Sequence, residues 1–288
     1  MYAFANTATF LKRYNLLYWH VTMYDGFDRV TTGQANGDKQ LAEPEATAEN
    51  SIKRRVAMHK LILWDVDGTL LYSGGVAGEA MRAAMTRVYG RTSTEARHSY
   101  AGKTDRQIIL ETFADLGHDA LLESLDRFTE AYITELSNRR EEFLARCRVL
   151  PGVTAALERM AQAGAIQSVL TGNLQPIAQI KLNLMQLTGW LDLAVGAYGS
   201  DHHRRAELVP FAVARAAQRY GHTFTGHDVV VIGDTPNDID CGRAAGAYTI
   251  AIATGPFSID DLRAHTPDAA LPDLADTDAL FTAIRQAG

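Results

Sequence analysis

Two carboxylates with one residue between them, Asp65 and Asp67, follow the apolar run 61–64. Side chains on a strand alternate between its faces, so the two carboxylates share a direction only where the strand ends. Gly68 supplies that freedom, and Thr69 adds a hydroxyl. This grouping suggests an aspartyl nucleophile beside a metal ion, whereas the competing interpretation is an Asp-Gly turn after a buried strand.

Polar groups also follow or precede regular patterns at three later points of the chain. These are Thr171-Gly172-Asn173 after the apolar run 166–170, Arg204-Arg205 ahead of a helical pattern, and Gly233 to Asp238 after the apolar run 229–232. The first would place a hydroxyl and an amide at a strand end, and the last places another pair of carboxylates at the mouth of a buried strand. The first two are weak alone, and the third is strong.

Helical and strand patterns alternate after Pro151-Gly152. The expected helices are 154–163, 176–187, 208–220, 239–245 and 278–286, and the expected strands are 166–170, 193–195, 229–232 and 247–253. This alternation predicts a parallel sheet covered on both faces, with ligands at the carboxyl ends of the strands. All four groups of polar residues fall at such ends or just beyond them.

The apolar period is helical between Tyr72 and Val149. A first apolar stripe runs from Ala77 to Val88 and ends at Gly90. A capping box at Thr104 begins a second helix, which passes through Phe113 and Leu116 and ends at Gly117. A third stripe runs from Leu121 to Leu136. An all-helical insertion is therefore expected here.

The ordered set of motifs resembles the haloacid dehalogenase superfamily, and specifically its phosphatase-type members with an α-helical cap. Asp65 to Thr69 looks like the first motif, Thr171-Gly172-Asn173 like the second, Arg205 like the third and Gly233 to Asp238 like the fourth. The third motif departs from the usual Lys followed by Pro, because Pro210 lies further downstream. Arg205 fits the helix spacing better than Arg204, and both stay open as the cation of this motif.

The resemblance implies an α/β fold, a Rossmann-like parallel sheet core with helices on both faces plus an inserted all-α cap domain. The core would comprise residues 58–71 and 150–288, and the cap residues 72–149. Residues 1–57 would be an N-terminal extension, poorly ordered in its polar half, and translation could start at Met58.

The resemblance also assigns roles to the motif residues. Asp65 would attack a phosphate monoester and form an acyl phosphate. Asp67 would serve as acid and base. A Mg²⁺ ion would bind Asp65, Asp234 and the backbone carbonyl of Asp67.

The remaining motif residues would hold the substrate. Thr171, Gly172, Asn173 and Arg205 would bind phosphate oxygens. Asp238 would orient Arg205 or a metal-bound water, unless it only caps the helix after it, and Thr171 could equally be a turn residue.

A loop of the cap, Gly102-Lys103-Thr104, would face the substrate and set specificity. The alternative is a helix N-cap with an exposed lysine. The adjacent His202 and His203 resemble a metal-ligand pair, but they lack further clustered ligands and are expected to be solvated.

The expected function is that of a Mg²⁺-dependent, phosphoglycolate-phosphatase-like enzyme acting on a small phosphorylated metabolite. A phosphomutase similar to β-phosphoglucomutase is the nearest alternative, since only exclusion of water separates the two outcomes. Haloacid dehalogenation needs neither Asp67 nor a metal, and both features are expected here. A non-catalytic binding protein would not need Asp65, Asp67 and Asp234 together.

Composition agrees with a cytoplasmic enzyme that acts as a monomer or homodimer. The 288 residues carry a formal net charge of −6, which argues against a nucleic-acid partner. The two cysteines, Cys147 and Cys241, are too few for a disulfide framework. No apolar run is long enough to span a bilayer, and no secretory signal begins the chain.

Overall fold

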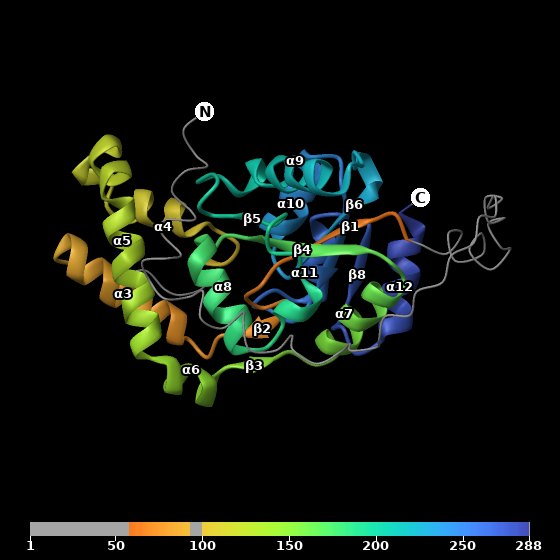
Figure 1. Ribbon diagram of the computed structural model, residues 1–288, viewed down its shortest axis with the longest axis horizontal. Coiled ribbons are helices and arrows are strands. Elements are labelled where there is room, and N and C mark those ends of the chain that lie inside the picture. Colours follow the sequence, from red (N-terminus) through yellow and green to blue (C-terminus); the bar gives the residue numbers. More distant parts are fainter. Residues whose placement is uncertain (1–57, 93–99, 288) are drawn as a thin grey trace, which may run out of the picture. The chain divides into compact units, whose positions relative to one another are not determined.

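A six-stranded sheet is the framework of the protein, which we describe from a computed structural model at residues 58–92 and 100–287. The strand order is β5-β4-β1-β6-β7-β8, and all neighbours run parallel (Figure 1). The strands are β1 (Leu61–Trp64), β4 (Ile166–Thr171), β5 (Ala197–Tyr198), β6 (Val229–Gly233), β7 (Tyr248–Ile252) and β8 (Ala269–Leu271). The chain builds outward from β1 first through β4 and then through β6, so the winding reverses beside β1, where such sheets bind ligands.

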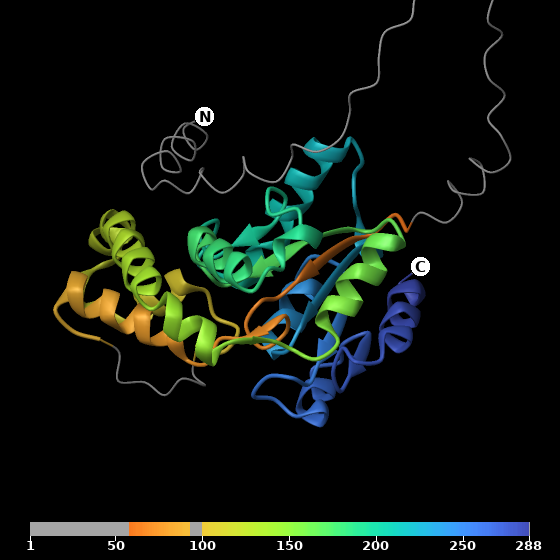
Figure 2. The same ribbon diagram turned by 60° about the horizontal axis from the view of Figure 1, so that its bottom comes forward.

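Helices cover both faces of the sheet because alternate strand residues point to opposite sides (Figures 1 and 2). Ile62 and Trp64 of β1 belong to one apolar core, and Leu61 and Leu63 belong to the other. The helices are α7 (Val153–Gln162), α8 (Gln175–Leu184) and α12 (Thr277–Gln286) on the first core, α9 (Val209–Tyr220) and α10 (Pro236–Ala244) on the second, and α11 (Ile259–Ala264) in a smaller cluster. The expected parallel sheet with two covered faces is confirmed.

A helical segment, residues 73–147, lies between two short strands that pair antiparallel, Leu71 with Val149 and Tyr72 with Arg148. Its described elements and these strands are β2 (Leu71–Tyr72), α3 (Val76–Tyr89), α4 (Asp105–Thr112), α5 (His118–Asn138), α6 (Arg140–Arg146) and β3 (Arg148–Val149). Helices α3 and α5 lie side by side in both views (Figures 1 and 2). The chain therefore leaves and re-enters the core at adjacent points.

Several element boundaries differ from those expected. The strand expected at 193–195 lies at 197–198, because Asp192 folds the preceding residues into a turn in which its side chain accepts from the Ala194 amide at 3.1 Å. Helix α10 begins at Pro236, three residues early, since Thr235 caps it. Helix α4 ends at Thr112, and the helix expected to reach Gly117 continues only as a 3₁₀ turn.

Some structure lies beyond what the sequence predicted. Helices α6 and α11 and strand β8 were not expected, and short 3₁₀ turns occur at Ala114–Leu116, Thr188–Trp190, Arg205–Glu207 and Gly226–Asp228. Among the described helices, none combines the length and apolar character needed to cross a membrane. The predicted extension, residues 1–57, lies outside the described residues.

Candidate active site

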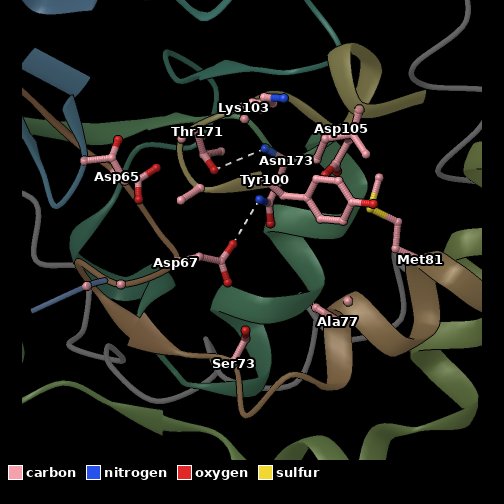
Figure 3. Close-up of a pocket in the computed structure, with 18 of the residues that line it drawn as sticks. Asp65, Asp67, Ser73, Ala77, Met81, Tyr100, Lys103, Asp105, Thr171 and Asn173 are labelled. Carbon is pink, nitrogen blue, oxygen red and sulfur yellow. Dashed lines mark hydrogen bonds between the residues drawn. The ribbon is translucent and has the colours of Figure 1, made fainter. Parts of the chain in front are cut away.

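Three neighbouring strands deliver the predicted site residues to one edge of the sheet. Asp65 follows β1, Thr171 ends β4, and Asp234 follows the last residue of β6. Because β1 lies between β4 and β6 and all three run parallel, their carboxyl ends meet. Figure 3 shows Asp65, Asp67, Thr171 and Asn173 around one space.

Arg205 binds the Asp65 carboxylate directly. Its Nη2 atom lies 2.6 Å from Asp65 Oδ1 and also donates to an oxygen of Asp238, and all three side chains are buried. Arg204 instead is exposed and pairs with Glu207 at 2.9 Å. The structure thus brings Arg205, and not Arg204, into the site.

Two local features hold Arg205 in place. It begins the 3₁₀ turn before α9, and its carbonyl accepts a hydrogen bond from Cys241 Sγ at 2.9 Å. Asp238 serves both roles considered for it, because one oxygen contacts Arg205 while the other accepts from the Thr235 amide at 3.1 Å and caps α10. Both cysteines are buried and unpaired.

Asp65, Asp234 and Asp238 form a compact acidic cluster. One carboxylate oxygen from each of the three residues lies within 4.8 Å of the other two. Within the described residues, this is the one cluster of His, Cys, Asp or Glu side chains that is spaced closely enough to share a metal ion. Burial raises the pKa of the Asp65 carboxyl to about 7, with Arg205 lowering it and Asp238 raising it. Burial, and then the charge of Asp65, raises the pKa of Asp234 well above its ordinary value.

The cluster suits a divalent cation. Three buried carboxyl groups lie together and Arg205 pairs with two of them, so the ionised cluster would carry more negative charge than this guanidinium offsets. Carboxylate oxygens are the ligands that Mg²⁺ prefers. Asp234 is oriented by Thr69, whose hydroxyl donates to it at 3.0 Å, and a Cβ at Gly68 (φ 93°) would collide with the Asp234 carboxylate.

Asp67 is held by groups other than those around Asp65. Its Oδ2 atom accepts from Asn173 Nδ2 at 3.0 Å and from Lys181 Nζ at 2.6 Å. Its Oδ1 atom is buried and has no hydrogen-bond partner among the described residues. Lys181 was not predicted as a site residue, and its one signal in the sequence is a charge on the otherwise apolar inner face of α8.

The second motif forms a turn that also joins the helical segment to the core. Thr171 Oγ1 accepts from the Asn173 amide at 3.2 Å, as in the turn considered for it, and Thr171 still lines the cavity. The Gly172 carbonyl accepts from the Asp105 amide at 2.8 Å, and a Cβ on Gly172 would collide with the Lys103 carbonyl. Gly172 therefore permits a close approach of two loops.

The predicted specificity loop lies against this turn. Thr104 caps α4, since its hydroxyl accepts from the Gln107 amide at 3.0 Å, and the Gly102 carbonyl accepts from Arg205 at 3.4 Å. The expected capping box is incomplete, because the Gln107 side chain donates to Glu111 instead. Lys103 lines the cavity, but its ammonium already pairs with Glu111 at 2.6 Å.

A cavity of about 490 Å³ opens in front of these residues. Besides the acidic residues, the helical segment contributes Met81, Arg82, Tyr100 and Tyr132 to its lining (Figure 3 labels Met81 and Tyr100). This volume fits a small molecule.

The adjacent histidines take no part in this site. The rings of His202 and His203 stack at 4.6 Å on the loop before Arg205, and neither belongs to the metal-type cluster found among the described residues. Both rings are half-buried rather than fully solvated, and His203 lies 6.4 Å from the ring of His118 on α5.

Comparisons with known proteins agree with this geometry. Residues 59–246 match the model of the haloacid dehalogenase-like hydrolase family. The phosphoglycolate phosphatase of Xanthomonas campestris pv. campestris is 27% identical over 198 residues, covering 68% of this chain and 84% of that protein.

Solved structures share the fold. A predicted phosphatase from Clostridium acetobutylicum superposes with a TM-score of 0.58 at 15% identity, over 79% of this chain and 98% of that chain. A protein from Bacteroides vulgatus with the provisional name β-phosphoglucomutase superposes with a TM-score of 0.58 at 22% identity, over 83% of this chain and 95% of that chain. The family match spans well over half of the sequence, and the chain therefore belongs to the haloacid dehalogenase-like hydrolases.

Proposed function

We propose that this hydrolase is a Mg²⁺-dependent phosphatase that acts on a small phosphorylated metabolite of the phosphoglycolate type. The observation that carries the proposal is the position of Asp65, at a strand end, with Arg205 on one of its oxygens and Asp234 beside it. A relative named phosphoglycolate phosphatase, 27% identical, supports the substrate class.

Asp65 would attack the phosphorus atom while the bond to the leaving-group oxygen breaks, which produces an aspartyl phosphate. Asp67 would give a proton to that oxygen and later take one from the water that hydrolyses the intermediate. Such acid–base help contributes roughly 10²–10⁴-fold to the rate. Hydrolysis releases inorganic phosphate and restores the Asp65 carboxylate.

The other residues would stabilise charge. Mg²⁺, held by Asp65, Asp234 and the Asp67 backbone carbonyl, would neutralise charge on the phosphate dianion and the approaching carboxylate. Arg205, the Thr171 hydroxyl and the Gly172 backbone amide would hold phosphate oxygens as charge develops.

Residues 72–149 would act as a cap over the site, with the core in residues 58–71 and 150–288. The cavity lining supports this division, because it combines strand-end residues with Arg82, Tyr100 and Tyr132 of the helical segment. A closed cap would exclude water from the reacting groups. Specificity would reside in Gly102 and Lys103, which line the cavity, together with Arg82; Thr104, predicted with them, is buried outside the lining and caps α4.

The test is release of inorganic phosphate from p-nitrophenyl phosphate and 2-phosphoglycolate, with Mg²⁺ and with excess chelator. We expect metal-dependent release from both, and faster turnover of the metabolite. Glucose 1-phosphate serves as the comparison, since a mutase would isomerise it without net phosphate release. Isomerisation, or no phosphate release from any substrate in a metabolite panel, would contradict the proposal.

A further inference from the structure

Lys181 is a buried cation to which the proposed mechanism assigns no function. Its side chain is 3% exposed, on the face of α8 that also buries Ile177, Ala178 and Leu182. Removing an ammonium from water costs several kcal/mol unless it is well paired. Lys181 is paired twice, with Asp67 Oδ2 at 2.6 Å and with Asn173 Oδ1 at 2.6 Å.

Asn173 closes this arrangement from the other side. Its amide nitrogen donates to Asp67 Oδ2 at 3.0 Å, while its amide oxygen accepts from Lys181 (Figure 3 shows the Asn173–Asp67 bond). Both donors therefore meet the same carboxylate oxygen. Asp67 Oδ1 has no partner among the described residues, although Asp67 lines the cavity.

The helix geometry explains how Lys181 reaches this position. Helix α8 begins at Gln175, two residues after Asn173. Side chains on a helix tilt toward its N-terminus. The long side chain of Lys181 thus runs back along α8 to the strand end, where a shorter residue at this position would not extend.

We propose that Lys181 is a positioning residue, which with Asn173 fixes Asp67 by Oδ2 and so holds its carboxyl group beside the cavity for proton transfer to the leaving-group oxygen of the substrate. This inference rests on the proposed function, in which Asp67 transfers a proton to that oxygen. Proton transfer needs the two heavy atoms within about 2.6–3.2 Å. Without Lys181 a single neutral amide holds Asp67, and its carboxylate is free to rotate away.

The experiment measures kcat/KM for Lys181→Met on an alkyl phosphate and on a series of aryl phosphates. This parameter reports the steps up to departure of the leaving group, and a good leaving group needs little protonation. We expect a loss of about 10²-fold on the alkyl phosphate and of less than about fivefold on p-nitrophenyl phosphate, so kcat/KM depends more steeply on leaving-group pKa. Lys181→Arg should recover much of the loss.

Two comparisons make the result specific. Asp67→Asn should show the same steepening, and the double variant should be no worse than Asp67→Asn alone. Lys60→Met is the matched control, because Lys60 is also buried and donates to the His227 carbonyl at 2.9 Å, away from the cavity. It should lower stability without changing the leaving-group dependence.

Equal losses on all substrates, or additive losses in the double variant, would show that Lys181 only holds α8 to the core. If Asp67→Asn itself causes no steepening, the proposed role of Asp67 fails; if it does and Lys181→Met does not, only the inference on Lys181 fails. Should Lys181→Met not fold, Lys181→Gln replaces it, since Gln is polar but uncharged and is too short to reach Asp67.

Discussion

Arg205 Nη2 lies 2.6 Å from Asp65 Oδ1, although 140 positions of sequence separate the two residues. The same guanidinium contacts Asp238, so one cation faces two buried carboxylates. A phosphate dianion in the cavity would compete with Asp65 for this guanidinium. We therefore expect the ion pair to orient Asp65 in the free enzyme and Arg205 to bind a phosphate group of the proposed substrate.

Replacing Asp65 by Asn should abolish turnover while leaving the protein folded. Loss of a covalent nucleophile should lower kcat by about 10³-fold or more. Burial raises the pKa of Asp65 to about 7. The free energy of unfolding therefore falls as the pH rises from about 4 to about 7, because the buried carboxyl group becomes ionised. Asn at this position stays neutral and avoids this loss. Urea unfolding at pH 8 without divalent metal should find the variant at least as stable as wild type. Substantial turnover by the purified Asp65→Asn variant would contradict the proposed role of Asp65 as the nucleophile.

Asp234→Asn should raise the Mg²⁺ concentration needed for half-maximal activity by about tenfold or more, because a carboxylate ligand is lost. The measurement is a Mg²⁺ titration of phosphate release. Asp240→Asn is the matched control, since Asp240 is an exposed aspartate on α10 that pairs with Arg243 at 3.5 Å. An unchanged titration for Asp234→Asn would assign the metal to other residues.

Asp105→Asn should make the protein more stable at neutral pH. Burial raises the pKa of Asp105 from 3.8 to about 6, against the lowering effects of the Leu174 amide and Lys181. The folded state thus binds a proton more tightly than the unfolded chain, and stability falls as the pH rises from about 4 to about 6. We expect the variant to gain up to about 3 kcal/mol above this range and nothing near pH 4.

Urea unfolding of wild type and Asp105→Asn at a series of pH values measures this difference. Asp126→Asn, at an exposed position of α5, controls for the removal of one charge from the helical segment. A difference between wild type and Asp105→Asn that stays constant with pH would show that Asp105 is not the source of the pH dependence.

Arg82 should contribute more than Lys103 to recognition of an anionic leaving group. The Arg82 guanidinium lines the cavity and has no hydrogen-bond or ion-pair partner within residues 58–92 and 100–287, whereas Lys103 pairs with Glu111. Arg82→Ala should lower kcat/KM for an acidic metabolite by about 10–100-fold, the value of a charged hydrogen bond, and spare an aryl phosphate with an uncharged leaving group.

Three measurements decide this point. Lys103→Ala should show the same selectivity with a smaller loss, and Arg87→Ala, an exposed cation of α3 that lies 4.0 Å from Glu135, should show none. Equal losses on both substrates for Arg82→Ala would place the specificity residues elsewhere in the helical segment.

The sheet was predictable because its central strands are short apolar runs. All of β1 and β6 is buried, so each run stands out between polar turns. Strand β8 is half-buried and β2 has two residues, and neither carries a pattern distinct from a loop. The positions of these two strands are set by pairing with β3 and β7, which the local sequence does not reveal.

The same contrast applies to the site. Asp65, Thr171 and Asp234 are predictable because each lies one or two residues after an apolar run, and parallel strands bring such positions together. Lys181 contacts Asp67 across 114 positions. The burial of a lysine does not show what it contacts, since Lys60, which donates to the His227 carbonyl and does not line the cavity, is buried as well.

The pairing of Leu71 with Val149 has a consequence for how this enzyme can change over evolution. Both ends of the helical segment meet at one antiparallel ladder, so an insertion, a deletion or a recombination event within it leaves every strand of the six-stranded sheet where it was. A segment that replaces residues 73–147 needs only to begin and end as close together as two paired strands. If this module sets substrate preference, as proposed, new preferences could be acquired by exchanging it, while the bond between Asp65 and Arg205, both in the core, is kept.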